Sequence, residues 1–360
     1  MIFTLILLQY FRPSIKKPLK KLDERLINKN VQSKNFIINP NKYIVFQSGY
    51  NGFADRIKGI VTTYAISLLI GRKFLIKMDQ PCNLTDFLLP NQIDWNKSFN
   101  ELIQEGKLRP NFTTLKYLKR NRGNFKAYNV TSVLNMAYRY WDIDVIFFTV
   151  NDNWLPFFQG NKYLKQRIFQ VGYAFHDFKM SFLLKDWLNK LFKFSTRLQE
   201  EYDKYTKLLK PKKDTYLICA QIRTHDIDNQ KNSSVGELFW NYIKTNYLDK
   251  NKTNDNYRIF ITSDYELIEK EALIYFGPEK VVYTTNVGKS NHFLKIQDCK
   301  NEIKSVLDFF LLSNCDLALH GHGEYGKTAY YNRDYPKSMQ MVKINDTAPS
   351  DFYLNMVTSL

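Results

Sequence analysis

The chain has 360 residues, of which 44% are hydrophobic and 16% aromatic. This composition excludes a disordered protein and allows two domains with separate cores. The formal net charge of +17 favours an anionic partner. Because no zinc-finger or RNP-like pattern accompanies the basic residues, we expect a solvated basic face or a groove for an anionic small molecule, and no nucleic-acid partner.

The N-terminus carries an apolar stretch at residues 2–11, followed by a basic cluster between Lys16 and Lys21. The stretch is shorter than the ~20 residues that span a bilayer, so it predicts either the remnant of a signal anchor or a short surface strand. N-x-S/T sequons fit a secretory chain, although an Asn-rich chain acquires some by chance. They lie at Asn83, Asn96, Asn111, Asn129, Asn232, Asn251 and Asn345. We expect membrane association through the N-terminus, in the Golgi membrane of the secretory pathway.

The first elements predict a βαβ unit. An apolar run at 43–47 has the pattern of a buried strand, and a glycine loop and a helical stretch at 57–70 follow it. The next strand is expected at 73–78, and a further buried strand at 145–150. Strands and helices in this order are typical of a parallel sheet.

A long helical pattern continues from Ser181 to Leu209, where the stretch 210–213 breaks it. Beyond this break, strands again alternate with helices. We expect strands at 215–223, 257–262, 280–283 and 316–319, and helices at 236–248, 265–276, 302–313 and from residue 326. The alternation predicts a second parallel sheet with helices on both faces. Such sheets bind ligands at the carboxyl ends of their strands.

Polar residues follow three strands of this second sheet. Arg223 and Asp226 follow the first of them, Asp264 follows the second, and a glycine loop follows the last. These groups fit a diphosphate ligand. Arginine can donate two parallel hydrogen bonds to phosphate oxygens, and a carboxylate can accept hydrogen bonds from ribose or base. The alternative is that Arg223 and Asp226 only pair with each other at the strand end.

The glycine loop and the helix start after it, Gly321–Thr328, also satisfy the Walker A pattern. A P-loop domain places most of its parallel sheet after this motif, but only residues 329–360 follow it here. The segment therefore predicts a phosphate-binding turn before a helix, and a P-loop nucleotide-binding enzyme is the alternative.

The cysteines are far apart and none lies in a CxxC pattern; they are Cys82, Cys219, Cys299 and Cys315. They indicate no zinc site and at most two disulfides. Cys219 falls in a predicted buried strand, where a small core side chain is the simplest interpretation. His320 and His322 lack acidic or Cys partners at ligand spacing, so we expect no metal.

Several segments resemble the fucosyltransferase superfamily, which contains the α1,2-, α1,6- and protein O-fucosyltransferases. In chain order they are Gly49–Ile60, Gln221–Asp226, Phe260–Asp264 and Leu307–Ala329, and Leu191–Ser195 is similar to the interdomain segment of the family. The resemblance implies a GT-B fold: two Rossmann-like α/β domains whose parallel sheets face each other across a cleft. It also implies a GDP-fucose donor and metal-independent, inverting transfer of fucose to a glycan or glycoprotein hydroxyl.

The resemblance also implies roles for single residues. Arg223 matches the family arginine that neutralises the departing β-phosphate of GDP, where a fixed cation lowers the barrier. Asp308 matches an aspartate near the nucleoside, and a carboxylate on the helix surface is the alternative. The other residues assigned to donor binding are Gly49, Gly52, Arg56, Asp264, Gly323, Tyr325, Gly326, Lys327 and Thr328.

An inverting transfer needs a base within hydrogen-bond reach of the acceptor hydroxyl. Asp55, Asp226 and Glu324 lie on loops that face the predicted cleft, and nothing in the sequence ranks them; the first two are our catalytic candidates beside Arg223. A water relay or the substrate itself is a further route for the proton. Gln221 and Gly323 differ from the residues that are common at these positions in the family. The resemblance therefore does not identify the acceptor substrate.

We divide the chain into four parts. They are an apolar segment and basic stem (1–40), an acceptor-side domain (41–195), a GDP-sugar-binding domain (196–335) and a tail that packs back (336–360). A catalytically inactive, glycan-binding descendant of the fold is a third interpretation, against which the presence of Arg223 and Asp308 argues.

Overall fold

The computed structural model describes residues 39–49, 51–118, 142–160, 162–224, 232–250, 255–285, 287–288, 298–333, 340–343 and 355–356. The N-terminal apolar segment and Asp226, one of the candidate bases, therefore lie outside the described residues. Among the helices that are described, none combines the length and the hydropathy needed to cross a bilayer.

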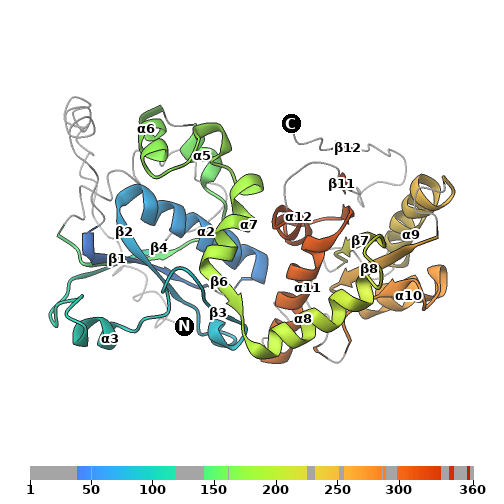
Figure 1. The fold of residues 1–360 in the computed structure, drawn as a ribbon, viewed down its shortest axis with the longest axis horizontal. Coiled ribbons are helices and arrows are strands. Elements are labelled where there is room, and N and C mark those ends of the chain that lie inside the picture. Colours follow the sequence, from blue (N-terminus) through green and yellow to red (C-terminus); the bar gives the residue numbers. More distant parts are fainter. Residues whose placement is uncertain are drawn as a thin grey trace, which may run out of the picture. The chain divides into compact units, whose positions relative to one another are not determined.

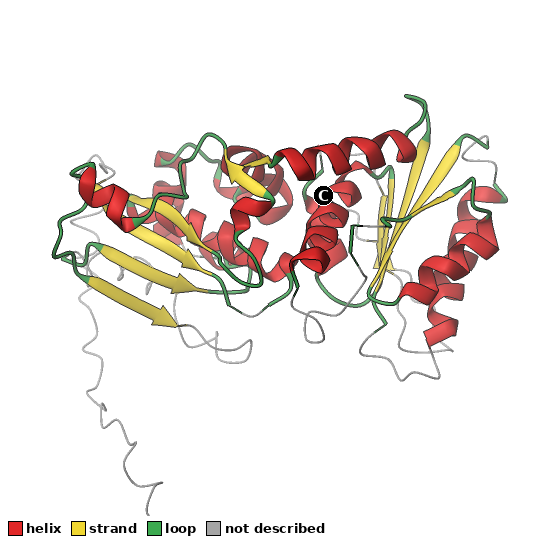
Figure 2. Cartoon of the chain, turned by 90° about the horizontal axis from the view of Figure 1, so that it is seen from below, coloured by secondary structure: helices red, strands yellow, loops and turns green. Residues whose placement is uncertain are grey.

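The first sheet has four parallel strands in the order β2-β1-β5-β4. Figures 1 and 2 show the strands of this sheet side by side. The strands are β1 (Asn39–Gln47), β2 (Arg72–Lys77), β4 (Thr114–Leu118) and β5 (Val145–Thr149). Successive side chains of a strand point to opposite faces. Ile44 and Phe46 accordingly pack with α2 (Phe53–Ile70), whereas Val45 belongs to a smaller core that includes Leu102 of α3 (Phe99–Gln104).

Helix α2 lies unusually close to this sheet at Gly59. A Cβ there would lie 2.0 Å from the carbonyl oxygen of Val150 and 2.5 Å from a ring carbon of Phe46. Only glycine allows this approach. The N-terminal end of α2 is thereby held beside the carboxyl end of β1.

The connection between the two sheets differs from the predicted continuous helix. Helix α7 (Met180–Leu191) ends where Phe192–Phe194 forms β6, which pairs antiparallel with β3 (Leu88–Pro90). Helix α8 (Thr196–Leu209) follows, with Ser195 as its N-cap. The Ser195 hydroxyl accepts a hydrogen bond from the Leu198 N–H. The prediction of one helix is wrong because strand pairing and this N-cap outweigh the local helix propensity.

The second sheet has the order β12-β11-β10-β7-β8-β9, and only β12 is antiparallel to its neighbour. Its strands are β7 (Tyr216–Ile222), β8 (Tyr257–Ser263), β9 (Val281–Val282), β10 (Leu317–His320), β11 (Gln340–Lys343) and β12 (Asn355–Met356). Side chains of α9 (Asn232–Ile243) and α10 (Glu266–Phe276) pack on one face, and those of α8 and α11 (Cys299–Leu311) on the other. The tail thus supplies a strand, β11, that no apolar run had indicated.

The remaining described elements are short. They are α5 (Leu155–Gln159), α6 (Lys162–Gln170), α12 (Tyr325–Tyr331), the turns Leu84–Asp86, Phe175–Asp177 and Leu312–Asn314, and the π-helical turn Lys244–Leu248. Helix α12 packs against α2 and α7 as well as α11. One apolar cluster therefore runs from the first sheet into the helices of the second.

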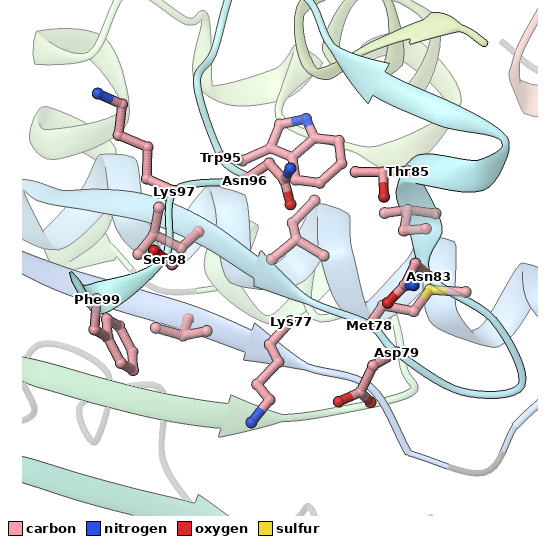
Figure 3. Close-up of a pocket in the computed structure, with 14 residues that line it drawn as sticks. Lys77, Met78, Asp79, Asn83, Thr85, Trp95, Asn96, Lys97, Ser98 and Phe99 are labelled. Atoms are coloured by element: carbon pink, nitrogen blue, oxygen red, sulfur yellow. The ribbon is translucent and has the colours of Figure 1, made fainter. Parts of the chain in front are cut away.

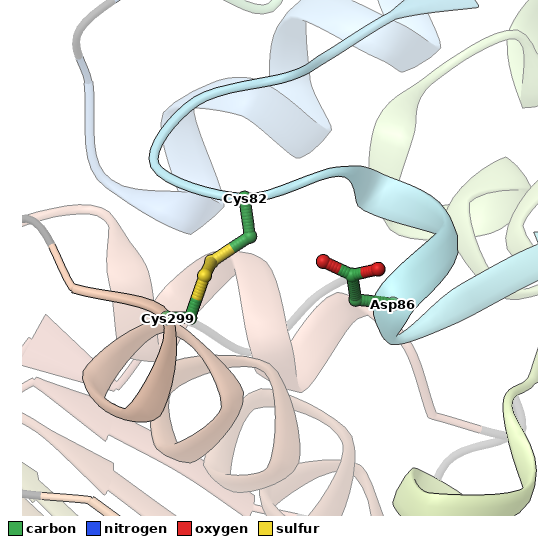
Figure 4. A group of neighbouring side chains, drawn as sticks. All are labelled: Cys82, Asp86 and Cys299. Carbon is green, nitrogen blue, oxygen red and sulfur yellow. A yellow bond between two sulfur atoms is a disulfide. The ribbon is translucent and has the colours of Figure 1, made fainter.

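All cysteines are in disulfides. Cys82 after β2 is bonded to Cys299 in the first turn of α11 (Figure 4), and Cys219 in β7 is bonded to Cys315 before β10. Cys219 is fully buried, which agrees with its interpretation as a small core residue, and its bond to Cys315 is one of the two disulfides that the sequence allowed. Asp86 lies beside the first disulfide, but sulfurs bonded to each other are not the thiolates that bind a metal.

Candidate functional site

Three strand ends of the second sheet meet because β10, β7 and β8 are parallel neighbours. The Gly321 N–H after β10 donates to the Gln221 carbonyl of β7 over 3.0 Å. Arg223 follows β7 directly, and Asp264 follows β8 in register beside it. The structure thus brings together the arginine, the aspartate and the glycine loop, as the sequence predicted.

Asp264 fixes the backbone next to Arg223. Its Oδ1 accepts hydrogen bonds from the Thr224 N–H at 2.8 Å and from the Thr224 hydroxyl at 3.1 Å. Thr224 is 2% exposed, so this contact is shielded from water. The structure therefore gives Asp264 a positioning contact that the sequence did not indicate.

Gly323 lies directly against the Arg223 side chain. Its φ of +93° is in the region that favours glycine, and a Cβ there would lie 3.1 Å from Nη1 and 3.2 Å from Cδ of Arg223. A larger residue would displace either the loop or the guanidinium. The loop therefore limits the orientations that Arg223 can take.

Helix α12 begins inside the Walker-like pattern. Tyr325, Gly326 and Lys327 are already helical, and the Thr328 N–H donates to the Glu324 carbonyl over 2.9 Å. The Thr328 N–H is therefore used by the helix, whereas a P-loop leaves the N–H groups of its loop to surround phosphates. Lys327 Nζ lies 3.8 Å from Glu324 Oε2. This arrangement does not fit the P-loop alternative.

The other loop residues hold α12 on the sheet. Thr328 is 1% exposed, the Tyr325 hydroxyl donates to the Ser305 carbonyl, and burial raises the pKa of Tyr325. A Cβ at Gly326 would lie 2.7 Å from Oε1 of Gln221. Gly326 therefore lets the helix lie against the end of β7, where it sets the position of the loop.

Asp308 is buried at 2% exposure, so the alternative of a carboxylate on the helix surface is wrong. Its Oδ2 accepts from the Thr262 hydroxyl at 2.8 Å and from Lys304 Nζ at 3.0 Å, and its Oδ1 accepts from the Thr284 hydroxyl at 2.6 Å. These contacts join α11 to the end of β8 and to the segment after β9. Asp308 thus fixes two strand ends beside Asp264.

Lys304 is the positive charge of this buried network. Its Nζ also lies 3.4 Å from Glu269 Oε1 and 3.1 Å from the Thr284 carbonyl. Burial disfavours the charged amine, but the carboxylates of Asp308 and Glu269 outweigh it, so the pKa of Lys304 is raised. Sequence analysis missed Lys304; its signal was a lysine four residues before an aspartate on an otherwise apolar helix face.

The glycine loop of the first sheet lies where β1 ends. Gly49 follows β1, and Gly52 is the N-cap of α2, with no heavy atom within 4 Å of a Cβ built on it. Asp55 in the first turn forms an ion pair with Lys58 Nζ at 2.7 Å. This candidate base therefore has its charge partly offset by a neighbour.

Arg56 is 4% exposed and its Nη1 lies 2.7 Å from Oε1 of Glu302 on α11. Burial lowers the pKa of Arg56 and raises that of Glu302, and in each case the partner's charge opposes the shift. Arg56 therefore joins the two sheets' helices in addition to any contact with a ligand. Sequence analysis missed Glu302, which is 246 residues away from Arg56 and leaves no local signal.

Aromatic contacts bring the two loops together. The ring of Phe53, next to Gly52, meets Phe309 edge-on at 5.3 Å between centroids, and Phe309 meets Tyr325 in the same way at 5.9 Å. One side chain, Phe309, thus bridges Phe53 at the start of α2 and Tyr325 at the start of α12. The loop after β1 and the loop after β10 consequently border one region.

Comparison with solved structures identifies the fold. NodZ α-1,6-fucosyltransferase soaked with GDP-fucose matches with a TM-score of 0.53 at 11% identity, over 88% of this chain and 99% of that one. An Arabidopsis thaliana FUT1 variant in complex with GDP matches with a TM-score of 0.59 at 10% identity, over 89% and 74%. The chain has the GT-B fold of these fucosyltransferases. Fucosyltransferase NodZ from Bradyrhizobium also matches, with a TM-score of 0.51 at 10% identity, over 88% and 98%.

The likeness is one of structure. No protein-family profile matches the sequence, and no curated protein matches it either. At such low identity the comparison establishes the fold, while the activity has to be argued from the site.

Proposed function

We propose that this chain is a fucosyltransferase that transfers fucose from GDP-fucose to a hydroxyl of a glycan or protein, with inversion and without a metal ion. The observation that carries the proposal is the position of Arg223 in this fold. It follows β7 between the Thr224–Asp264 contact and Gly323, and solved relatives in fold bind GDP or GDP-fucose.

In the proposed reaction, the acceptor oxygen attacks the anomeric carbon of fucose while the bond from that carbon to the diphosphate breaks. The electron pair of this bond leaves with GDP, and negative charge builds on the β-phosphate. A guanidinium held at that place stabilises the developing charge, because it is already oriented before the reaction. Arg223 takes this role, which would otherwise call for a cation from solution.

The acceptor proton passes to a carboxylate, and our candidates are Asp55 and Asp226. Asp55 lies in the first turn of α2, beside Gly52, and Asp226 follows Arg223 by three residues. Comparing the Asp55→Asn and Asp226→Asn variants separates them. The base is the one whose loss lowers kcat for sugar transfer but leaves the GDP affinity unchanged.

Asp308, Lys304 and the adjacent threonines support the nucleoside end of the proposed site. The network holds the ends of β8 and β9, next to the phosphate end at Arg223. We propose that Asp308 acts by positioning these strand ends around the nucleoside.

The test is calorimetric titration of the full chain with GDP, GDP-fucose and ATP, with and without magnesium. We expect GDP binding that ignores magnesium and is lost in Arg223→Ala. Arg223→Lys should recover only part of it, because lysine keeps the charge but lacks the planar fork. Arg197→Ala, an exposed arginine on α8, is the matched control.

Other outcomes would favour one of the alternative functions or contradict the role of Arg223. Magnesium-dependent ATP binding would favour the P-loop alternative, and binding of glycans without any nucleotide would favour an inactive, glycan-binding protein. Persistence of GDP binding in Arg223→Ala would contradict the assigned role.

We propose that the chain works in the secretory pathway, in the Golgi membrane, anchored through its N-terminus. The Cys82–Cys299 disulfide supports this, because Cys299 is exposed and such bonds persist in oxidising compartments. The sequon asparagine Asn111 is exposed as well. Sensitivity of the cell-expressed chain to endoglycosidase tests this placement, and a chain without glycans in the cytosol would contradict it.

A further inference from the structure

A cavity of about 320 Å³ lies at the carboxyl end of β2 in the first sheet (Figure 3). Its floor is apolar and rigid: Val45, Leu75 and Leu84 are at most 3% exposed, and Trp95 is 1% exposed. The Trp95 indole N–H donates to the Leu191 carbonyl, which fixes the ring. The volume is near the lower end of the ~300–1,000 Å³ range of small-molecule sites.

The rim of the cavity is polar and comes from two separate segments. Lys77, Asp79, Asn83 and Thr85 come from the end of β2 and the loop after it, and Asn96 comes from the segment before α3 (Figure 3). Among the residues that the structure describes, the side chains of Asp79, Asn83, Thr85 and Asn96 have no hydrogen-bond or ion-pair partner. Their polar atoms are therefore available to a ligand.

Both segments are held before any ligand binds. The Cys82–Cys299 disulfide pins the loop after β2, and the Leu84 N–H donates to the Met78 carbonyl over 3.0 Å. On the other side, Ser98 and Glu101 form a capping box at the start of α3. A rim of this kind lowers the ordering cost of binding.

The chemistry of the rim selects a neutral sugar. Amides donate and accept, a carboxylate accepts, and a hydroxyl does both, which are the contacts that sugar hydroxyls need. The apolar floor suits the C–H face of a sugar ring. The formal charges of Lys77 and Asp79 sum to zero. Lys97 is paired with Asp94 at 3.5 Å and with Glu105, so the rim has no excess positive charge to favour an anion.

The cavity lies at the same sheet edge as the glycine loop. Lys77 is in register with Gln47 of β1, and the Ser48 N–H donates to the Lys77 carbonyl over 3.0 Å. Gly49 follows immediately. A sugar in the cavity would therefore lie beside the loop that borders the proposed donor site.

We propose that this cavity binds one or two neutral sugar units of the acceptor, with Asp79, Asn83 and Asn96 as the specificity-determining contacts. The role as acceptor rests on the proposed function, whereas the binding of a neutral saccharide does not. Asn83 and Asn96 also lie in sequons, so the proposal requires both side chains to be unmodified, and a glycan on either would occupy the rim in place of the acceptor.

The test uses the full chain made in bacteria, so that both asparagines are unmodified. Saturation-transfer NMR with lactose, cellobiose and chitobiose, and with sulfated lactose as the anionic probe, measures binding in the presence of GDP. We expect at least one neutral disaccharide to bind, and its affinity to fall about tenfold in Asp79→Ala and in Asn96→Ala. Asp214→Ala and Asn100→Ala change exposed residues outside the cavity and are the matched controls.

GDP titration of each variant separates the two proposals. A urea unfolding midpoint equal to that of the wild type would show that Asp79→Ala and Asn96→Ala are folded. Saccharide binding that disappears in them while GDP never binds would uphold the cavity and contradict the proposed function. Equal saccharide binding in variants and controls, binding of sulfated lactose only, or no disaccharide binding at all would overturn the cavity proposal.

Discussion

Arg56 of α2 and Glu302 of α11 form an ion pair between helices of the two sheets, with 2.7 Å between Nη1 and Oε1 and side-chain exposures of 5% and 11%. Removing one partner leaves the other charge buried without compensation. The pair therefore ties the start of α2, and the glycine loop before it, to the second half of the chain.

We expect Arg56→Ala and Glu302→Ala each to lower the free energy of unfolding by about 3–5 kcal/mol. The double variant Arg56→Met/Glu302→Leu should lose much less, because no charge is left buried. Urea unfolding measures this, with Lys204→Ala as the control for an exposed ion pair, to Glu201. Single variants whose urea unfolding midpoints equal that of the wild type would contradict this prediction.

Gly323→Ala should weaken GDP binding about tenfold, which corresponds to ~1.4 kcal/mol. The added Cβ would lie 3.1 Å from Nη1 of Arg223 and would move the guanidinium. Gly172→Ala is a matched control, because its φ of +91° is similar but no atom lies within 4 Å of its Cβ.

Both glycine variants should lose similar stability, about 1–2 kcal/mol from the left-handed backbone. Only Gly323→Ala should lose GDP affinity, as measured by calorimetry. Equal GDP affinity in the two variants would mean that the contact with Arg223 has no effect on the ligand.

Lys304 should make the free energy of unfolding decrease as the pH rises into the alkaline range. Burial lowers its pKa, but Asp308 and Glu269 outweigh this and raise it above the ordinary 10.5. The folded state then holds its proton to higher pH than the unfolded state. The stabilisation is fully present below pH 10.5 and is lost as the pH rises through the folded value.

The Lys304→Met variant should lack this alkaline loss and be less stable at neutral pH, where Asp308 and Glu269 would remain buried together. Unfolding measured on both sides of pH 10.5 tests this. Lys300→Met, an exposed lysine on the same helix, should keep the wild-type profile. If the free energy of unfolding of Lys304→Met decreases with pH as steeply as that of the wild type, groups other than Lys304 cause the decrease.

The Cys82–Cys299 disulfide should react with a mild thiol reductant before Cys219–Cys315. Cys299 is exposed, whereas Cys219 and Cys315 are 0% exposed. Alkylation followed by peptide mapping should therefore label Cys82 and Cys299 first, and earlier labelling of Cys219 would contradict the burial.

The Cys82→Ser/Cys299→Ser variant should lose about 2–5 kcal/mol of unfolding free energy, because this crosslink closes a long loop. Reductant should lower the stability of the wild type toward that of the variant and change the variant little. A variant as stable as the oxidised wild type would show that the crosslink contributes nothing.

Much of the sheet architecture could be predicted because central parallel strands are buried on both faces and read as continuous apolar runs. The runs at 43–47, 145–150 and 215–223 became β1, β5 and β7. Strand β11, with the sequence QMVK, has no such run, and only its pairing with β10 makes it a strand.

The candidate site divides in the same way. Arg223, Asp264 and the glycine loop could be placed together because each follows a strand, and the ends of parallel strands share one edge. The partners of Arg56 and of Cys82 could not be predicted, since they depend on contacts across 246 and 217 residues. Asp308 was found by resemblance, but its threonine partners follow from packing alone.

The long-range disulfide makes most of the polypeptide a closed ring. Cys82 and Cys299 are 217 residues apart, and the chain passes through both sheets between them. A protease that cuts once within this ring opens it without releasing a fragment. The cut molecule would run as one band on a non-reducing gel and separate into two fragments only after reduction. A single band under oxidising conditions therefore does not show that the backbone is uncut.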